Sequence, residues 1–427
     1  MRHRQTQIQV NEIANLAELV IARCRKLATF SEDAGSLRRT FLSPPMRNVH
    51  QEIVGWLEPL GVDVRVDAAG NLRAVYTAEE SVAPRLMIGS HLDTVPNAGA
   101  YDGMLGVVLA VALLQGLRGR KLPYAIEVVG FSEEEGVRFG TPFIGSRALV
   151  GRLDGNLLDT RDACGISVRT AIEEFGLNPA EIAQAALADD VCGYLEFHIE
   201  QGPVLEKFGR PLGVVEAIAG QNRLEFTFVG RANHAGTTPM DLRFDAMAGA
   251  AEWITMVERA AKDVSGLVAT VGSVKTTPGA VNVIAGEARL SLDVRHRADD
   301  VRMRAVEDLT HRAQEVARRR GLSVRCGTNL NQQAVAMDPF LSGQIKEAIH
   351  KTGCESQGMV SGAGHDAMIL AEKVPAGMIF LRTPGGISHD PAESVAVEDV
   401  AKAIECGLHL LDQLASATKF QTRTCRA

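Results

Sequence analysis

Acidic and imidazole side chains recur in five short segments of this sequence, and four of the segments adjoin runs that are typical of strands. The segments are GSHLDT (89–94), AYDGMLG (100–106), FSEEEGVRFG (131–140), EFHIEQGP (196–203) and, in a glycine-rich loop, PGGISHDPAE (384–393). In open α/β sheets, ligands bind outside the carboxyl ends of the strands. We therefore expect these segments to meet at one edge of a sheet and to form a polar site.

Two of these residues also have ordinary structural explanations. His91 follows the apolar run 85–90 and could be a structural histidine whose ring is satisfied by its neighbours. Asp102 precedes the apolar run 103–117, and Asp is a common cap at a helix N-terminus. Its second oxygen could still point into the same crevice, so both interpretations stay open.

The three consecutive carboxylates Glu133, Glu134 and Glu135 directly follow a buried apolar strand. Such side chains repel one another unless a cation or a proton is close. A solvated surface loop is the alternative. Adjacent residues on a regular strand face opposite ways, so the chain must leave strand geometry here, and Gly136 makes that easier.

Two further histidines complete the candidate set. His198 lies between Glu196 and Glu200, which is typical of a metal ligand oriented by carboxylates, and His389 follows two glycines in a loop that can approach a ligand closely. Three histidines and several carboxylates without cysteine suit zinc or manganese, and a carboxylate can bridge two ions. Two such ions activate a water, and a spare carboxylate can act as general base.

The elements that would position these groups alternate along the chain. Apolar strands such as 124–132 alternate with helices such as 103–117, which favours an α/β domain with a central, largely parallel twisted sheet. Between 211 and 330 the pattern changes to β-β-α-β-β-α-β, close to the ferredoxin-like split βαβ plan. We therefore expect a discontinuous catalytic domain, residues 1–210 and 331–427, interrupted by an inserted α+β domain, residues 211–330.

Charge and composition exclude several classes of partner. The 427 residues carry a formal net charge of −7, which argues against nucleic acid or an anionic membrane as the main partner. No apolar run reaches the roughly 18–20 residues of a membrane span, and no secretory signal is expected. The seven cysteines lack a CxxC pair and are typical of reduced thiols in a cytoplasmic protein.

Seven motifs in order resemble the M20-type metallopeptidase-like amidohydrolases, in the branch of allantoate amidohydrolase, N-carbamoyl-L-amino-acid hydrolase and β-ureidopropionase. The resemblance covers almost the whole chain. Its motifs are GSHLDTVPNAGAYDGMLGV, FSEEEGVRFG, FHIEQGPVLE, NHAGTTPM, PGAVNVIAGEARLSLDVRH, SGAGHDA and GISHDPAE.

The resemblance implies a site with two divalent metal ions per subunit, zinc or manganese. His91 and His198 would hold one ion, Glu135 and His389 the other, and Asp102 would bridge them. Glu134 would take a proton from the bridging water.

The resemblance also implies that the inserted domain is a lid and a homodimerisation surface. His234 would reach into the partner subunit's active site to polarise the scissile carbonyl, and Arg295 would hold a substrate carboxylate. A loop histidine bonded to its own turn and an ordinary surface arginine are the alternatives. The implied substrate residues are Gln201, His234, Asn282, Arg295 and Gly364, while His365 and Asp366 resemble walls of the site.

The function implied is hydrolysis of linear amide C–N bonds in small ureido acids. The segments RTFLSPPMR (39–47) and NAGAYDGMLG (97–106) favour an allantoate amidohydrolase that releases ammonia. An N-carbamoyl-L-amino-acid hydrolase or β-ureidopropionase, an M20 peptidase, and a metal-binding module without catalysis are the alternatives.

Overall fold

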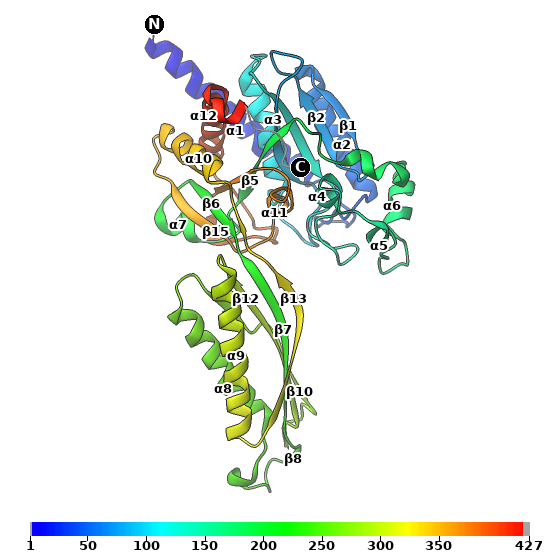
Figure 1. Cartoon of the computed structure of the whole chain (residues 1–427), viewed down its shortest axis with the longest axis vertical. Helices are drawn as coiled ribbons and strands as arrows, with labels where there is room; N and C mark the ends of the chain where they lie inside the picture. Colours follow the sequence, from blue (N-terminus) through cyan, green and yellow to red (C-terminus); the bar gives the residue numbers. More distant parts are fainter. Residues whose placement is uncertain (1, 422–427) are drawn as a thin grey trace. The chain divides into compact units, whose positions relative to one another are not determined.

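The computed structural model describes residues 2–421, so Cys425 lies outside the described residues. The chain forms two compact units (Figure 1). The first contains the described residues up to Glu216, Met337–Met359 and the chain from His365 onward; the second contains Ala217–Ala336 and Val360–Gly364.

The larger sheet has nine strands in the order β1-β2-β4-β3-β5-β16-β6-β14, and β15 also pairs with β6. The strands are β1 (Asp63–Val66), β2 (Leu72–Tyr76), β3 (Arg85–His91), β4 (Ala125–Phe131), β5 (Val191–Ile199), β6 (Leu212–Ile218), β14 (Val335–Ala336), β15 (Gln357–Ser361) and β16 (Ala376–Leu381). The four central strands β4, β3, β5 and β16 are parallel. Strands β2 and β6 join this centre antiparallel.

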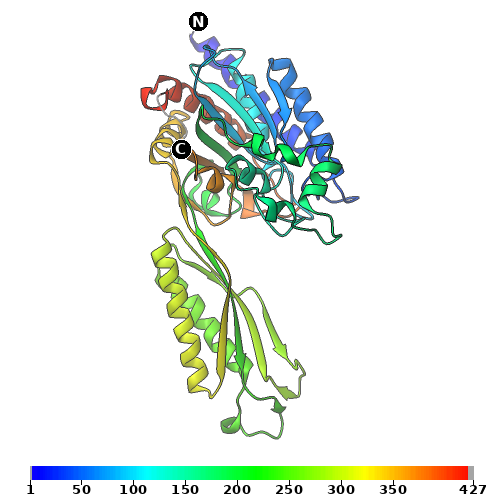
Figure 2. The ribbon, with the colours of Figure 1, turned by 45° about the vertical axis from the view of Figure 1, so that its right-hand side comes forward.

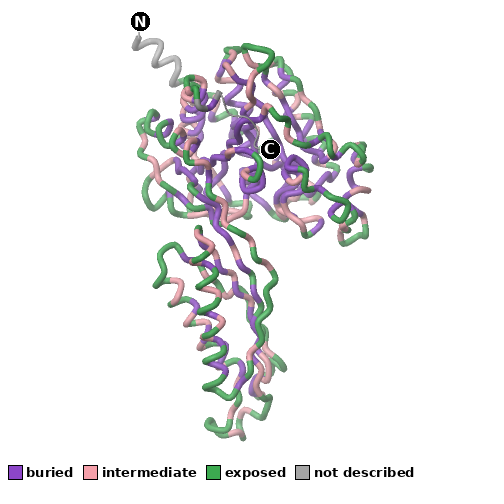
Figure 3. Tube along the Cα trace, in the orientation of Figure 1, coloured by how far each residue is buried: buried purple, intermediate pink, exposed green. Residues whose placement is uncertain are grey.

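Every residue of β4, β5 and β16 is buried, and Figure 3 shows buried chain throughout the middle of this unit. A strand buried along its whole length has both faces covered, which is why most residues of these strands are apolar. The expected α/β fold with a central, largely parallel sheet is confirmed.

The helices of the first unit cover the sheet, and α3 packs on β3, β5, α1 and α12. Because α3 is surrounded in this way, it is apolar on nearly all sides. The helices are α1 (Arg2–Leu27), α2 (Pro44–Leu57), α3 (Met104–Leu117), α4 (Ile144–Leu149), α5 (Gly155–Leu158), α6 (Val168–Glu174), α7 (Val204–Phe208), α10 (Pro339–Lys351), α11 (Asp366–Leu370), α12 (Val397–Ser416) and α13 (Thr418–Gln421), with 3-10 turns at Glu58–Leu60, Pro179–Ala185 and Pro384–Gly386.

The second unit is an antiparallel sheet, β10-β12-β7-β13 with β9 also on β12, whose one face carries two helices that lie side by side (Figure 2). Trp253 of α8 packs on Phe226 of β7 and fills its core. The elements are β7 (Gly220–Val229), β8 (Asn233–His234), α8 (Ala246–Asp263), β9 (Val268–Thr270), β10 (Val274–Thr277), β11 (Val283–Ile284), β12 (Glu287–His296), α9 (Asp299–Arg319) and β13 (Ser323–Gln332), with a 3-10 turn at Met240–Leu242.

Two expectations about strands are wrong. The run 211–220, expected as the first strand of the inserted domain, forms β6, which pairs with β16 in the larger sheet. The sequence pattern also predicts a single strand over 267–276, but this run is broken into β9 and β10, which both pair with β12. Alternation of apolar residues indicates a strand but does not specify the sheet that it joins, which explains the first error.

Among the described residues, no helix combines the length and the apolar character that crossing a bilayer requires.

Candidate metal centre

The predicted site residues of the first unit gather at the carboxyl ends of neighbouring parallel strands. His91 is the last residue of β3, His198 lies one residue before the end of β5, and Glu133–Glu135 follow β4. Asp102 lies just before α3, and His389 lies in the loop after β16. Because β4, β3 and β5 are adjacent, their ends bring these side chains to one place.

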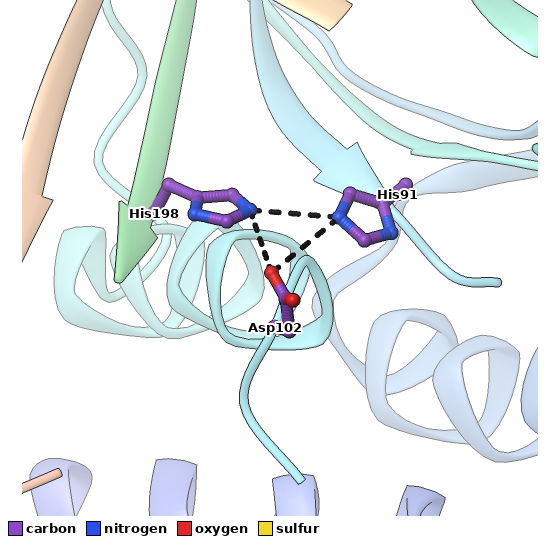
Figure 4. A group of neighbouring side chains, drawn as sticks. All are labelled: His91, Asp102 and His198. Atoms are coloured by element: carbon purple, nitrogen blue, oxygen red, sulfur yellow. Dashed lines mark hydrogen bonds and ion pairs between the residues drawn. The ribbon is translucent and has the colours of Figure 1, made fainter. Parts of the chain in front are cut away.

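One oxygen of Asp102 faces two histidines, as Figure 4 shows. Oδ1 of Asp102 lies 3.2 Å from Nε2 of His198 and 3.9 Å from Nε2 of His91. The two Nε2 atoms are 3.5 Å apart. All three side chains are buried, so three ligand atoms converge on one small volume.

The other oxygen of Asp102 faces a second pair of residues. Oδ2 lies 3.1 Å from Nε2 of His389, which in turn lies 3.7 Å from Oε1 of Glu135. Nε2 of Gln201 donates to both oxygens of Asp102, at 3.2 and 3.0 Å. Asp102 therefore stands between two groups of ligand atoms, the position that a bridging carboxylate would take.

The far nitrogens of the two buried histidines are held by backbone carbonyls. Nδ1 of His91 lies 3.0 Å from the oxygen of Asp93, and Nδ1 of His198 lies 2.9 Å from the oxygen of Ile199. A carbonyl only accepts, so each Nδ1 carries a proton and each Nε2 faces the cluster, where it can serve as a ligand atom.

The carboxylates that flank His198 do not orient it, contrary to expectation. Glu196 accepts hydrogen bonds from Ser90 and from the backbone of Ala367. Glu200 accepts from the backbone at the start of α7. Glu196 is on the same side of β5 as His198, but its carboxylate is hydrogen-bonded to β3 and α11. Glu200 lies beyond the end of the strand.

The helix-cap alternative for Asp102 is wrong. Gly103 is the N-cap of α3, with φ 69°, and no side chain caps it. A Cβ at Gly103 would lie 2.4 Å from ring atoms of His91, so glycine is required both by the backbone angle and by the close approach of the ring.

Glu134 and Glu135 both reach the cluster because the chain turns at Gly136, which has φ 73°. Their backbone N–H groups donate to the two oxygens of Asp93, at 2.9 and 3.1 Å. Ligand atoms of His91, Glu134 and Glu135 lie within 4.8 Å of one another. The solvated-loop alternative is therefore wrong, since Glu133 and Glu134 are buried and Glu135 is half-buried.

The charges of the cluster perturb one another strongly. Burial alone would raise the pKa of Asp102, but hydrogen bonds to His198 and His389 outweigh it and hold the pKa well below its usual range. Burial raises the pKa of Glu134 well above its usual value, and burial with the charge of Asp102 raises the pKa of Glu135 to about 7. Crowded, buried carboxylates of this kind are stabilised by a cation.

Two functional residues escaped the sequence analysis, although both lie inside the quoted motifs. Asp93 holds the backbone of Glu134 and Glu135, and its Oδ1 lies 3.5 Å from Nδ1 of His91. Glu393 accepts from the backbone of Asp102. Their position could have identified them, because each lies within four residues of a predicted ligand histidine, in a motif in which only the histidine was given a role.

The wall residues His365 and Asp366 are buried, and the ring of His365 packs edge-on against His198 with centroids 4.4 Å apart. Burial and the neighbouring His198 hold the pKa of His365 well below its usual value. His365 is therefore a neutral packing partner of a predicted ligand.

The other predicted substrate residues, His234, Asn282, Arg295 and Gly364, belong to the second unit. Nδ1 of His234 accepts from the backbone of Gly236, as in a loop histidine bonded to its own turn. Arg295 is paired with Asp293 at 2.7 Å and donates to the carbonyl of Gly362 at 2.6 Å. Asn282 lies beside β11, and its carbonyl accepts from Ala235.

The donor set fits divalent metal ions. Imidazole nitrogens and carboxylate oxygens suit zinc and manganese, and the described residues offer three overlapping groups of such atoms, two of which share Asp102. His91, Asp102 and His198 form one group, and Asp102, Glu135 and His389 another.

Comparison with known proteins agrees with this geometry. Residues 87–413 match the model of the peptidase family M20/M25/M40. An allantoate deiminase of Arabidopsis thaliana is 40% identical over 94% of this chain and 83% of its own length. An N-carbamoyl-L-amino acid amidohydrolase of Geobacillus stearothermophilus is 38% identical over 90% of this chain and 95% of its own length.

A solved structure agrees as well. The amidase of the hydantoinase/carbamoylase family from Burkholderia multivorans matches 92% of this chain and 97% of its own, with a TM-score of 0.87 and 29% identity. The central parallel strands carry histidines and carboxylates at their carboxyl ends, an arrangement that suits a metal-dependent hydrolase of the α/β class. The chain belongs to the peptidase family M20/M25/M40. The predictions of the family and of a metal-dependent amidohydrolase are confirmed.

Proposed function

We propose that this chain is an allantoate amidohydrolase that cleaves a ureido C–N bond and releases ammonia. The observation that carries the proposal is Asp102, whose two oxygens face two separate ligand groups in a chain that is 40% identical to an allantoate deiminase. We further propose two ions, zinc or manganese, with His91 and His198 on one and Glu135 and His389 on the other.

Two ions held by these residues would activate a water and polarise the scissile carbonyl. Glu134 accepts the proton of that water and delivers it to the departing nitrogen. The water oxygen forms the new bond to the carbamoyl carbon, the C–N bond breaks, and ammonia leaves. The carbamate product then loses carbon dioxide and leaves an amine. The buried position of Glu134 beside Glu135 supports this role.

We propose substrate-binding roles for Gln201, Asn282 and Gly364. Gln201, whose side-chain amide donates to Asp102, would bind polar groups of the substrate. Arg295 binds the substrate carboxylate in place of Asp293, its partner at 2.7 Å.

We propose that residues 211–330 act as a lid and as the surface of a homodimer, with residues 1–210 and 331–427 forming the catalytic domain. Met240, Leu242 and Met247 of this segment are large apolar side chains that are more than half exposed, which supports an interface there. His234 would then act in the partner subunit's site. The buried thiols of Cys24 and Cys406, which form no disulfide, support a cytoplasmic location.

The test is ammonia release from a substrate panel with defined metal loading. Allantoate, N-carbamoyl-L-amino acids and 3-ureidopropionate are compared after the protein is stripped and reloaded with zinc or manganese. Turnover of allantoate that needs metal supports the proposal. Faster turnover of N-carbamoyl-L-amino acids, the substrates named for a relative that is 38% identical, would mean that these and not allantoate are the substrates. Bound metal without turnover of any compound in the panel would contradict catalysis.

A further inference from the structure

Glu393 is a buried carboxylate that contacts the backbone of Asp102, the residue that two groups of ligand atoms share. Its Oε1 accepts hydrogen bonds from the N–H groups of Tyr101 and Asp102, at 2.8 and 3.1 Å. The side chain is nine-tenths or more buried. Because α3 begins only at Met104, these two N–H groups have no place in its hydrogen-bond ladder and need an outside acceptor.

The same carboxylate also contacts the loop that carries His389. Oε2 of Glu393 lies 3.4 Å from Oγ of Ser388, the neighbour of His389. The backbone N–H of Glu393 donates to the carbonyl of Asp390 at 3.0 Å and closes the turn after His389. One side chain therefore joins two segments that are remote in sequence and that each carry a proposed ligand.

The chain leaves space for this carboxylate at Gly99. A Cβ at that position would lie 2.5 Å from Cδ and Oε1 of Glu393. Any larger residue at position 99 would displace the carboxylate from the two N–H groups.

We propose that Glu393 is a positioning residue for the metal centre: it fixes the peptide of Asp102 so that the two oxygens of Asp102 face the two ligand groups. This inference rests on the proposed metal site. Glu393 touches neither the ligand atoms of the histidines nor the reacting atoms in this scheme. It acts through the backbone of Asp102 and through Ser388.

The test compares Glu393→Ala with Glu393→Gln, whose amide oxygen can still accept both N–H groups. Zinc and manganese affinities are measured by competition with a chromophoric chelator, and exchange of the Tyr101 and Asp102 amide hydrogens is measured without added metal. Glu393→Ala should weaken metal binding by about 10–100-fold, the usual effect of losing an outer partner of a ligand, and should speed exchange of both amides. Glu393→Gln should stay within a few-fold of wild type in both measurements.

Asp162→Ala is the matched control. Asp162 also accepts two backbone N–H groups, those of Cys164 and Ile166, at 2.9 and 3.0 Å, in a loop without proposed site residues. It should keep wild-type metal affinity. Equal loss in Asp162→Ala, or unchanged affinity or amide exchange in Glu393→Ala, would overturn the inference. If the wild-type chain binds neither metal, the proposed metal site fails, whereas amide exchange still decides whether Glu393 holds this peptide.

Discussion

At the scale of single residues, the proposal gives two neighbouring glutamates after β4 different roles: Glu134 is the general base and Glu135 is a metal ligand. We expect Glu134→Gln to keep its metal content and to lose about 10²–10⁴-fold in turnover, because an amide cannot accept the proton of the water. Metal content is measured by plasma mass spectrometry and turnover by ammonia release.

Glu135→Gln is the contrast variant, because Glu135 is assigned as a ligand. It should lose metal and turnover together. Metal loss in Glu134→Gln with retention in Glu135→Gln would mean that the two roles are exchanged.

His50 lies outside the metal centre and should make the protein acid-sensitive. Burial, with the charges of Arg39 and Arg47, lowers its pKa to about 4. Between pH 6.5 and 4 the unfolded chain therefore binds a proton that the folded chain does not. The free energy of unfolding should fall by up to about 1.4 kcal/mol per pH unit as the pH drops through this window.

Urea unfolding at several pH values tests this expectation. His50→Phe should flatten the pH dependence by one proton, and His350→Gln, at an exposed histidine, should keep the wild-type slope. An unchanged slope in His50→Phe would show that other groups carry the acid sensitivity.

The sequence predicted which histidines and carboxylates gather in the cluster, because these residue types stand out in the five short motifs. It could not resolve how each side chain is used. Asp102 could cap α3 or point into the site, and only the fold shows that Gly103 takes the cap position. Glu196 and Glu200 were expected to orient His198. Glu196 instead accepts a hydrogen bond from Ser90, which is remote in sequence, and Glu200 accepts from the backbone of Val204 at the nearby start of α7. The partner of Glu196 depends on long-range packing, which local spacing does not encode.

At the scale of elements, the start of α3 is where the backbone must come closest to a ligand. We expect Gly103→Ala to weaken metal binding by about 10–100-fold, because the added Cβ would lie 2.4 Å from ring atoms of His91 and would displace the ring. Isothermal titration with manganese measures the effect.

Gly119→Ala is a matched control, because Gly119 also has a positive φ, 79°, but an added Cβ there meets no atom within 4 Å. Both variants strain the backbone. If the two variants bound metal equally weakly, the effect would be due to backbone strain and not to the contact with His91.

The same scale explains which elements could be predicted. The largely apolar run 124–132, which contains β4, indicated a buried strand in a largely parallel sheet. The prediction of the sheet to which β6 belongs was wrong. β6 pairs with β16 through tertiary packing, which the alternation of apolar residues in β6 does not determine.

At the scale of the whole molecule, the assignment of His234 to the partner's site has a test by complementation. His234→Ala and Glu134→Gln subunits should each be inactive as homodimers. In a mixed dimer, one site combines an intact Glu134 with an intact His234 of the other subunit. Mixing should therefore restore activity, measured by ammonia release after subunit exchange is verified with two affinity tags.

The control mixes His234→Ala subunits that carry the two tags, which should remain inactive after the same exchange. A lack of recovery in verified mixed dimers would place His234 in the site of its own subunit.

The order of strands has a consequence for biosynthesis. β16 is the last of the described strands along the chain, yet it lies between β5 and β6 in the sheet. While the chain is being made, β5 therefore presents an open hydrogen-bonding edge until residues 376–381 leave the ribosome, and such edges attract other nascent chains. Chains truncated before this strand should aggregate, and the proposed ligand His389, which follows β16, can join the cluster only after β16 has been synthesised.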